Sequence, residues 1–485
     1  MEERLLIYEK SAPGTIGAPL PSTGRPETEL MELIPEKYRR REKPPLPEVT
    51  EGEVVRHFVG LSTKNHHIDR GFYPLGSCTM KYNPKINDKV AALPGFANQH
   101  PLAPCRTSSG SLQLMYELGQ YLMEISGFDE ISLQPVAGAQ GEFTGLLIIR
   151  AYHLDRGENR KKIIIPDSAH GTNPASVSLA GFETVQIASN EKGIIDPEAV
   201  AAVVDEDTAG MMLTNPNTLG LFESNIEEVV RIIHEAGALL YMDGANLNAQ
   251  LGIVKPGRIG FDILHFNLHK TFSTPHGGGG PGGGATAVTE ELGPFLPAPV
   301  VARKSDGSGE YFLDYDRPKS IGRLHAYNGN FANAVRAYAY IRTLGGPGLK
   351  AVAENAILNA NYLKALLGDE FDIPFDDICQ HEFVLSCNRQ KKLGVKALDM
   401  AKRILDYGFH APTVYFPLIV PEAFMIEPTE TESRYTLERF AEVLKEISRD
   451  AAENPDKLTS APHRTPVRRL NEVKAARELD VCYRG

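Results

Sequence analysis

The sequence predicts an α/β protein with a mostly parallel central sheet and a smaller C-terminal α/β domain. Two observations predict this class. Short apolar runs alternate with helical patterns between residues 130 and 270, and a Gly/Pro-rich break near residue 345 precedes a second set of elements. The hydrophobic share of 42% and the charged share of 23% are ordinary for a globular chain, so a large core can form.

Six apolar runs are expected to form the strands of the central sheet. They are EISLQPV, KKIIIPD, ETVQIA, TAGMMLT, ALLYMD and DILHFN, and helical patterns such as GEFTGLLIIRAYHLDR and IEEVVRIIHEAG lie between several of them. An earlier helical pattern starts at Ser108 and should end at Gly127. Strand and helix alternation of this kind places helices on both faces of the sheet. Ligands then bind beyond the carboxyl ends of the strands.

A chain of 485 residues is too long for one core, so we expect two domains and an arm. Residues 1–70 are rich in Pro, Gly and charge and should form an extended arm over a partner subunit, or else a disordered tail. Residues 71–345 should form the large domain and 346–485 the small one, joined by a hinge at TLGGPG. A further helix is expected near residues 397–407.

Charge and composition argue against several classes of protein. Acidic residues outnumber basic ones by 62 to 51, so a nucleic-acid surface is not expected. No apolar run is long enough to cross a membrane, and the start MEERLLIYEK has no targeting pattern. Five scattered cysteines without CxxC spacing favour reduced thiols in the cytoplasm.

Lys270 is the first candidate for chemistry, because it follows the run DILHFN by three residues. A lysine amine at a strand end could form a Schiff base with an aldehyde cofactor, of which pyridoxal phosphate is the usual one. A lone lysine is more often a solvated charge. Asp243 ends the preceding run and could pair with a protonated pyridine nitrogen, although helix capping or metal binding would also suit it.

Other strand ends carry further candidates. His170 could stack on a cofactor ring, and Thr172 could donate a hydrogen bond. The amides around Ala139 and Gln140 could bind a phosphate at the start of a helix, although any tight turn between strand and helix favours glycine. Asn215 could contact the ring hydroxyl of the cofactor, but Asn-Pro is also an ordinary turn signal.

The glycine loop GGGGPGGG lacks the order of a nucleotide phosphate loop, so nucleotide binding is not predicted. Its position just after Lys270 would allow it to close over a substrate. A flexible linker is the plain alternative. No metal site is predicted.

Several long segments resemble the decarboxylating glycine dehydrogenase, or P-protein, family over most of the chain. They are HKTFSTPHGGGGPGGG, HGTNPAS, TNPNTLG, YMDGANLNA, NHHIDRGFYPLGSCTMKYNP and MIEPTETES. The resemblance implies a fold type I pyridoxal-phosphate enzyme with Lys270 as the Schiff-base lysine, Asp243 as the partner of the pyridine nitrogen and His170 as the stacking residue. By their place in the motifs, Thr172, Asn215, Ala245 and His269 would line the cofactor.

The resemblance also implies an activity and partners. Glycine would lose its carboxylate as carbon dioxide, and the aminomethyl group would pass to the lipoyl arm of a carrier, H-protein. The chain length and the single lysine motif resemble subunit 2 of the split form of this family, which implies a heterotetramer with two copies of subunit 1. Ser77, Cys78, Thr79 and Arg323 could also reach the site, but a tight turn, a core thiol and a surface charge explain them as simply.

Two rival interpretations remain open from the sequence. One is another fold type I enzyme, such as a glycine hydroxymethyltransferase or a cysteine desulfurase. The glycine loop and the EPTETES segment argue against it. The other is a non-catalytic scaffold subunit, which would have no need of Lys270, Asp243 and His170 together. Replacing Lys270 by alanine separates an enzyme from a scaffold.

Overall fold

The computed structural model describes residues 5–19, 21–22, 24–26, 32–42, 44–276 and 282–482. The chain divides into two compact units. The larger unit is Ile68–His463, and the smaller combines Met1–His67 with Arg464–Gly485. No helix among the described residues is both long and apolar enough to cross a membrane.

The larger unit is built on a seven-stranded sheet with the order β1-β7-β6-β5-β4-β2-β3. Only β7 runs against its neighbours, so the sheet is mostly parallel, as predicted. Its strands are β1 (Glu130–Ser132), β2 (Lys162–Pro166), β3 (Glu183–Ile187), β4 (Thr208–Thr214), β5 (Leu239–Gly244), β6 (Ile263–Asn267) and β7 (Gly284–Val288). All six predicted strands form, and β7 is an addition.

Helices cover both faces of this sheet, because side chains alternate along each strand. On β5, Leu240 and Met242 join a core with α5, α9 and α11, whereas Leu239 and Tyr241 join a second core with α6 and α7. The helices of this part are α3 (Lys85–Ala91), α4 (Pro94–Ala97), α5 (Ser109–Ser126), α6 (Gly138–Asp155), α7 (Thr172–Leu179), α8 (Pro197–Ala201), α9 (Ile226–Glu235), α10 (Pro256–Ile259) and α11 (Phe331–Leu367). Helix α5 ends at Gly127 in the left-handed conformation, as predicted.

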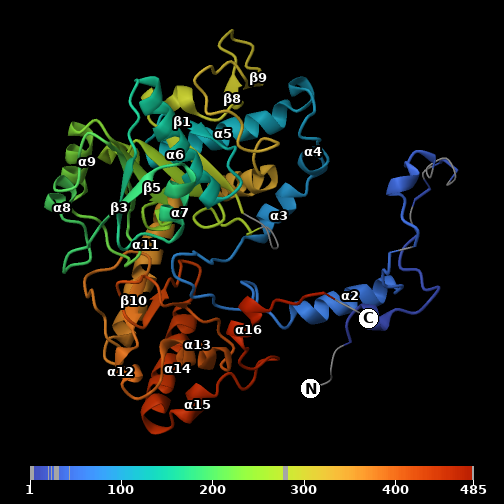
Figure 1. Ribbon diagram of the computed structural model, residues 1–485, viewed down its shortest axis with the longest axis vertical. Helices are drawn as coiled ribbons and strands as arrows, with labels where there is room; N and C mark the ends of the chain where they lie inside the picture. The colour runs from blue at the N-terminus through green and yellow to red at the C-terminus, as the bar shows by residue number, and fades with distance from the viewer. Residues whose placement is uncertain are drawn as a thin grey trace. The chain divides into compact units, whose positions relative to one another are not determined.

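The predicted hinge at residues 343–348 is not a loop. It lies within α11, whose helical runs meet at a kink where Gly345 has φ 61° and ψ −179°. Glycine accepts such backbone angles, so the chain turns there without an intervening loop. Figure 1 shows α11 passing from the seven-stranded sheet towards β10 and the C-terminal helices.

A second, three-stranded antiparallel sheet lies after α11, with the order β10-β12-β11. One face packs on α11, α13 and α14 around residues such as Leu363, Met400 and Phe440. The other face packs on Leu219 and Leu221, which follow β4. The elements of this part are β10 (Phe383–Ser386), α12 (Asn388–Lys391), α13 (Ala397–Leu405), β11 (Thr413–Val414), β12 (Ala423–Ile426), α14 (Arg434–Glu453) and α15 (Asp456–Thr459). Earlier in the chain, a separate hairpin pairs β8 (Val300–Arg303) with β9 (Tyr311–Asp314).

The smaller unit contains more regular structure than an extended arm. Helix α2 (Glu51–Ser62) begins with a capping box in which Thr50 and Glu53 satisfy each other's backbone amides, and α16 (Glu472–Arg477) lies near the C-terminus. The expectation that residues 1–70 are extended is therefore wrong for residues 51–62. The predicted division at residues 70 and 345 stays a prediction.

Candidate functional site

A cavity of about 660 Å³ lies at the carboxyl edge of the large sheet. Residues that follow β1, β2, β4, β5 and β6 line it, because these five strands run in the same direction and end at the same edge. Thr413 of the second sheet, Phe416 in the loop after β11 (Thr413–Val414), and Leu75–Cys78 complete the wall. Of the predicted site residues, Ala139, His170, Thr172, Asp243, Ala245, His269 and Lys270 line this cavity.

Lys270 follows β6, and its side chain is half-buried at the cavity wall. Its amine donates a hydrogen bond of 2.8 Å to the backbone oxygen of Ser77, and among the described residues the amine forms no ion pair. The amine is therefore held at the cavity without being neutralised by a carboxylate. An amine in this position can react with an aldehyde group placed in the cavity.

Asp243 lies near the end of β5 and is 2% exposed. Its carboxylate accepts hydrogen bonds from Asn173 Nδ2 at 3.0 Å and from the backbone of Ala245 at 2.9 Å. Burial alone would raise the pKa of Asp243, but His265, Asn173 and Lys270 outweigh burial and hold the pKa below its ordinary value. Asp243 is therefore a buried anion that faces the cavity.

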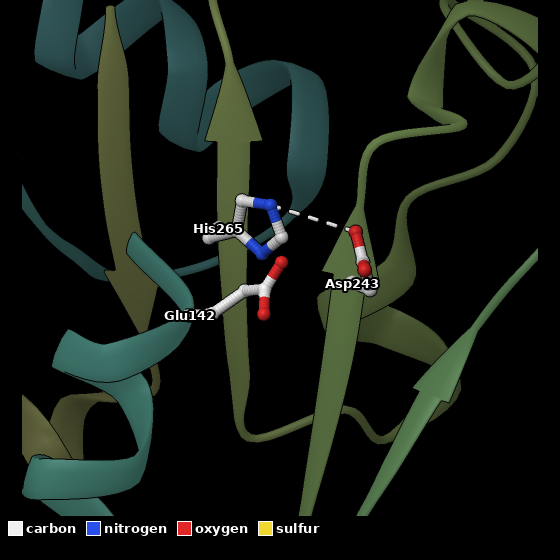
Figure 2. Close-up of side chains that lie close together, drawn as sticks. All are labelled: Glu142, Asp243 and His265. Carbon is white, nitrogen blue, oxygen red and sulfur yellow. Dashed lines mark ion pairs between the residues drawn. The ribbon is translucent and has the colours of Figure 1, made fainter. Parts of the chain in front are cut away.

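Glu142 and His265 flank Asp243 and were not among the predicted site residues. Figure 2 shows Glu142 reaching from α6 and His265 from β6 towards Asp243. His265 Nε2 lies 3.5 Å from Asp243 Oδ1. Burial and the charge of Asp243 raise the pKa of Glu142 to about 7. The three side chains thus place one firmly ionised carboxylate beside one that titrates near neutral pH.

His170 and Thr172 form a connected pair after β2. The backbone N–H of Thr172 donates to His170 Nδ1 at 3.2 Å, and the hydroxyl of Thr172 donates to Glu142 at 2.8 Å. His170 Nδ1 also lies 2.8 Å from the hydroxyl oxygen of Thr172, so contacts with Thr172 fix the orientation of the ring. Burial lowers the pKa of His170, so the ring is neutral at pH 7. A neutral ring of this kind can stack on an aromatic ligand.

The start of α6, where the sequence predicts an anion site, lies at the cavity. Gly138 and Ala139 line the cavity, and no side chain caps the first turn, so its amide groups lack intrahelical partners. The side chain of Gln140 does not line the cavity. Its Oε1 instead accepts from the backbone of Val136 at 2.8 Å, which leaves only the backbone amide of Gln140 for an anion.

The remaining predicted residues differ in position. Ala245 and His269 line the cavity, and burial lowers the pKa of His269 to about 3. Asn215 is fully buried behind the wall, where its Oδ1 accepts from the backbone of Glu223 at 3.1 Å. Arg323 is exposed and donates to Ala326 and Tyr315. The glycine segment 277–281 lies outside the described residues, so its predicted closure stays a prediction.

The chemical groups around the cavity fit pyridoxal phosphate. The amine of Lys270 matches the aldehyde, the anionic Asp243 matches a protonated pyridine nitrogen, and the first turn of α6 matches the phosphate. Thr214 also lines the cavity, and its buried hydroxyl has no partner among the described groups. The volume of the cavity also suits a small aromatic cofactor with a small substrate.

Sequence reasoning missed Glu142 and His265 for a physical reason. His265 lies inside the strand DILHFN. The sequence pattern of this strand indicates that it is buried, but it does not show which polar side chains lie next to His265. Glu142 lies in the first turns of α6, where acids are common for helix stability alone. Both residues could have been found as acidic or imidazole side chains within otherwise apolar elements, because a buried polar side chain often marks a functional site.

Comparisons with known proteins show the family of the chain. A family model described as "Glycine cleavage system P-protein" matches residues 27–407, and one described as "Glycine dehydrogenase, C-terminal domain" matches residues 352–466. The chain is 56% identical to a probable glycine dehydrogenase (decarboxylating) subunit 2 of Chloroherpeton thalassium, over 99% of this chain and 97% of that protein. It is 57% identical to the same type of protein from Listeria monocytogenes serotype 4b, over 100% and 99% of the two chains.

Solved structures show the same fold. An inhibitor-bound glycine decarboxylase (P-protein) superposes with a TM-score of 0.74 at 21% identity, covering 88% of this chain and 100% of that chain. A tryptamine-bound TDC of Oryza sativa with PLP superposes with a TM-score of 0.64 at 12% identity, covering 86% and 90%. The fold is therefore that of fold type I pyridoxal-phosphate enzymes, as predicted.

Proposed function

Because the chain belongs to the glycine cleavage system P-protein family, we propose that it decarboxylates glycine with pyridoxal phosphate and passes the aminomethyl group to a lipoyl carrier. One observation carries the proposal at this site. Lys270, Asp243 and His170, from three separate strand ends, line one cavity whose other wall offers the uncapped start of α6. A scaffold subunit would have no use for this arrangement.

The residues of the cavity would hold the cofactor by complementary chemistry. Lys270 would bind its aldehyde carbon, and the first turn of α6, at Ala139 and Gln140, would bind its phosphate. Asp243 would keep a proton on the pyridine nitrogen. His170 would stack on the ring with Ala245 packing beside it, Thr172 and His269 would complete the surroundings, and Asn215 would support the wall from behind. When bound, the cofactor supplies an electron sink for the pair released from the glycine carboxylate.

The proposed reaction breaks two bonds and forms one carbon–sulfur bond and one sulfur–hydrogen bond. The bond between the carboxylate carbon and the α-carbon of glycine breaks, and carbon dioxide leaves. The electron pair left on the α-carbon forms a carbon–sulfur bond with the lipoyl disulfide, whose sulfur–sulfur bond breaks. The second sulfur keeps the electron pair of the broken sulfur–sulfur bond and then takes a proton to give a thiol. Asp243, held anionic by its partners, keeps the site able to stabilise that pair before transfer.

Partners are part of the proposal. The relatives are named subunit 2, which supports a second subunit, and we propose two copies of each chain with H-protein as the lipoylated acceptor. The cytoplasm is the proposed compartment, and the five cysteines, all free in the structure, support a reducing one. We also propose that residues 71–345 and 346–485 act as the large and small domains, with residues 1–70 contacting the partner.

Turnover tests the function directly. The chain is combined with subunit 1, pyridoxal phosphate and lipoylated H-protein, and release of labelled carbon dioxide from carboxyl-labelled glycine is measured. Lys270→Ala should abolish release. Lys192→Ala, an exposed lysine beyond β3 and outside the cavity lining, should leave it unchanged. Equal release by Lys270→Ala and the natural chain would overturn the enzyme assignment in favour of a scaffold.

A further inference from the structure

Two buried glutamates meet at the end of the small sheet that faces the large one. Glu382 directly precedes β10 and Glu427 directly follows β12, and these strands pair so that Phe383 lies opposite Ile426. Both glutamates are 0% exposed. One carboxylate oxygen of each and a ring nitrogen of His381 all lie within 4.8 Å of one another.

Each glutamate holds one backbone amide of the segment Gly76–Thr79. The N–H of Ser77 donates to Glu382 Oε2 at 2.6 Å, and the N–H of Thr79 donates to Glu427 Oε2 at 2.9 Å. Ser77 and Thr79 have φ values of 60° and 23°, which are unfavourable for residues other than glycine. Such angles persist only where the surroundings impose them, so the two carboxylates fix the shape of this segment.

The same segment connects the small sheet to Lys270. Gly76 donates to the backbone of Met425 on β12 at 3.2 Å, and Leu75 forms a β-bridge with Ile426. The backbone oxygen of Ser77 then accepts the hydrogen bond of 2.8 Å from Lys270 Nζ. The side chain of Cys78 lines the cavity between these contacts. The position of the lysine amine therefore depends on how the two glutamates hold the segment.

Neither carboxylate is paired with a cationic side chain in the part of the chain that the structure describes. Among the described residues, neither forms an ion pair with lysine or arginine, and the donors to Glu382 are the amide groups of Ser77 and Asn246. Glu427 Oε1 is buried and has no hydrogen-bond partner among the described groups. Two adjacent buried charges without a counter-ion are strongly unfavourable. A proton on Glu427 Oε1 would remove one of the two charges and make this oxygen a hydrogen-bond donor.

The charges that face the pair come from several elements. Lys270 favours the ionised forms of both glutamates, whereas Glu430 opposes ionisation of Glu427. Glu430 is itself paired with the buried Lys81 at 2.8 Å. His381 is neutral, since burial lowers its pKa to about 3, and the thiol of Cys78 is neutral because burial raises its pKa. Burial and its neighbours raise the pKa of Glu427 to about 7.

We propose that Glu382 and Glu427 are positioning residues that share one proton at neutral pH and hold the segment Gly76–Thr79 against Lys270. Loss of this proton places two like charges under the segment and loosens it. The proposal rests on the proposed function only in giving Lys270 its chemical role. The shared proton and the holding of the segment are properties of the folded chain alone.

Thermal unfolding against pH tests the shared proton. Glu427→Gln replaces the protonated carboxyl by a neutral group of the same shape, so at pH 5 the full chain with pyridoxal phosphate should unfold as the natural chain does. As pH rises from about 4.5 to about 7, the natural chain loses stability, because the unfolded form releases the proton while the folded form still holds it, whereas the variant has no proton to lose. The Tm of the variant should therefore exceed that of the natural chain at pH 8.5 by on the order of 2–5 °C.

Glu422→Gln is the matched control, because Glu422 directly precedes β12 but pairs with Lys391 at 2.8 Å. Burial would raise the pKa of Glu422, but Lys391 holds it below its ordinary value, so its Tm difference should stay constant from pH 5 to 8.5. A constant difference for Glu427→Gln as well would overturn the shared proton. The shared proton would also be overturned if the natural chain contained one equivalent of a divalent metal and Glu427→Gln contained none.

Alkylation of Cys78 tests the holding of the segment. Iodoacetamide labelling of the chain with pyridoxal phosphate is followed at Cys78 by peptide mass spectrometry. Glu427→Gln keeps an oxygen for the amide of Thr79, whereas Glu427→Ala does not, and both remove the same carboxylate. Cys78 should react about tenfold faster in Glu427→Ala than in Glu427→Gln, since a lost hydrogen bond to a buried amide is worth roughly that factor. Equal rates would overturn the proposal.

These measurements separate the two proposals because neither uses turnover. If glycine decarboxylation is absent but the Tm and alkylation results hold, the pair stands and the proposed function fails. If decarboxylation is present but both variants behave as the natural chain at every pH, the function stands and the pair fails.

Discussion

At the scale of single residues, the site depends on charges that neighbours hold in fixed states. Asp243 stays ionised although it is buried, because an amide, a backbone N–H and His265 surround it. Glu142 accepts hydrogen bonds from Thr172 and Ser176, but burial and the charge of Asp243 raise its pKa to about 7. The sequence predicts Asp243 from its position at a strand end. It does not predict Glu142, because no local pattern reveals that α6 presents this acid to β5.

Asp243→Asn tests the role of the buried anion. An amide cannot keep a proton on the pyridine nitrogen, so glycine decarboxylation should fall by about 10²–10³-fold, the usual loss for one preorganised electrostatic contact. Cofactor binding should persist, as judged by visible absorption.

Asp167→Asn is the control for that experiment. Asp167 follows β2 at the same sheet edge, but its carboxylate accepts from Ser189 at 2.6 Å and does not line the cavity. Turnover should match that of the natural chain. If Asp243→Asn also retained full turnover, the carboxylate would have no part in the reaction.

Glu142→Gln tests the titrating acid. The pKa of Glu142 is raised in the folded chain, so its stabilising contribution is present below the unfolded value of about 4.5 and is lost as pH rises to about 7. The cofactor-free variant should therefore gain stability over the natural chain between pH 5 and pH 8, by up to ~3 kcal/mol. Urea unfolding at both pH values measures this difference.

Glu117→Gln provides the comparison. The hydroxyl of Tyr338 lowers the pKa of Glu117, so this residue stays ionised throughout that window and its effect should not vary with pH. The same free-energy difference at pH 5 and pH 8 for Glu142→Gln would show that Glu142 remains ionised in the folded chain.

At the scale of elements, the apolar runs predict the parallel strands well because β2, β4, β5 and β6 are buried on both faces. They predict β7 poorly. Three of its five residues, GATAV, are Gly or Ala, which have little strand preference, and the strand follows a glycine loop. The kink at Gly345 was expected as a loop, because Gly and Pro signal a break in the helix but do not show whether helix resumes at once on both sides.

Gly138→Ala tests the close packing at the start of α6. A methyl group at residue 138 would lie 2.0 Å from Asn267 Oδ1, and Asn267 is buried at the end of β6. The helix start must then shift, which should cost about 1–3 kcal/mol of stability and weaken cofactor binding. Equilibrium dialysis with pyridoxal phosphate and urea unfolding measure both effects.

Gly110→Ala is the corresponding control in α5, since nothing lies within 4 Å of the added methyl group. It should leave cofactor binding unchanged and stabilise the helix by roughly 0.5–1 kcal/mol. Cofactor binding by Gly138→Ala at the affinity of the natural chain would mean that the start of α6 is not part of the cofactor site.

At the scale of the whole molecule, the site is assembled from segments that are far apart in the sequence. Residues near positions 76, 139, 170, 243, 270 and 413 line one cavity. The rule that ligands gather at strand ends predicts the central members of this set. It does not predict Ser77–Thr79 or Glu382 and Glu427, because their contacts depend on long-range pairing between the small sheet and a segment that precedes the large one.

The central claim is that Lys270 carries the cofactor. The most direct test is borohydride reduction of the purified chain with pyridoxal phosphate, followed by peptide mapping of the reduced adduct. The structure predicts loss of the visible absorption band and a single stable adduct on Lys270, whose amine lines the cavity without a carboxylate partner. An adduct on another lysine, or an unmodified Lys270 when the cofactor is fully bound, would contradict the account.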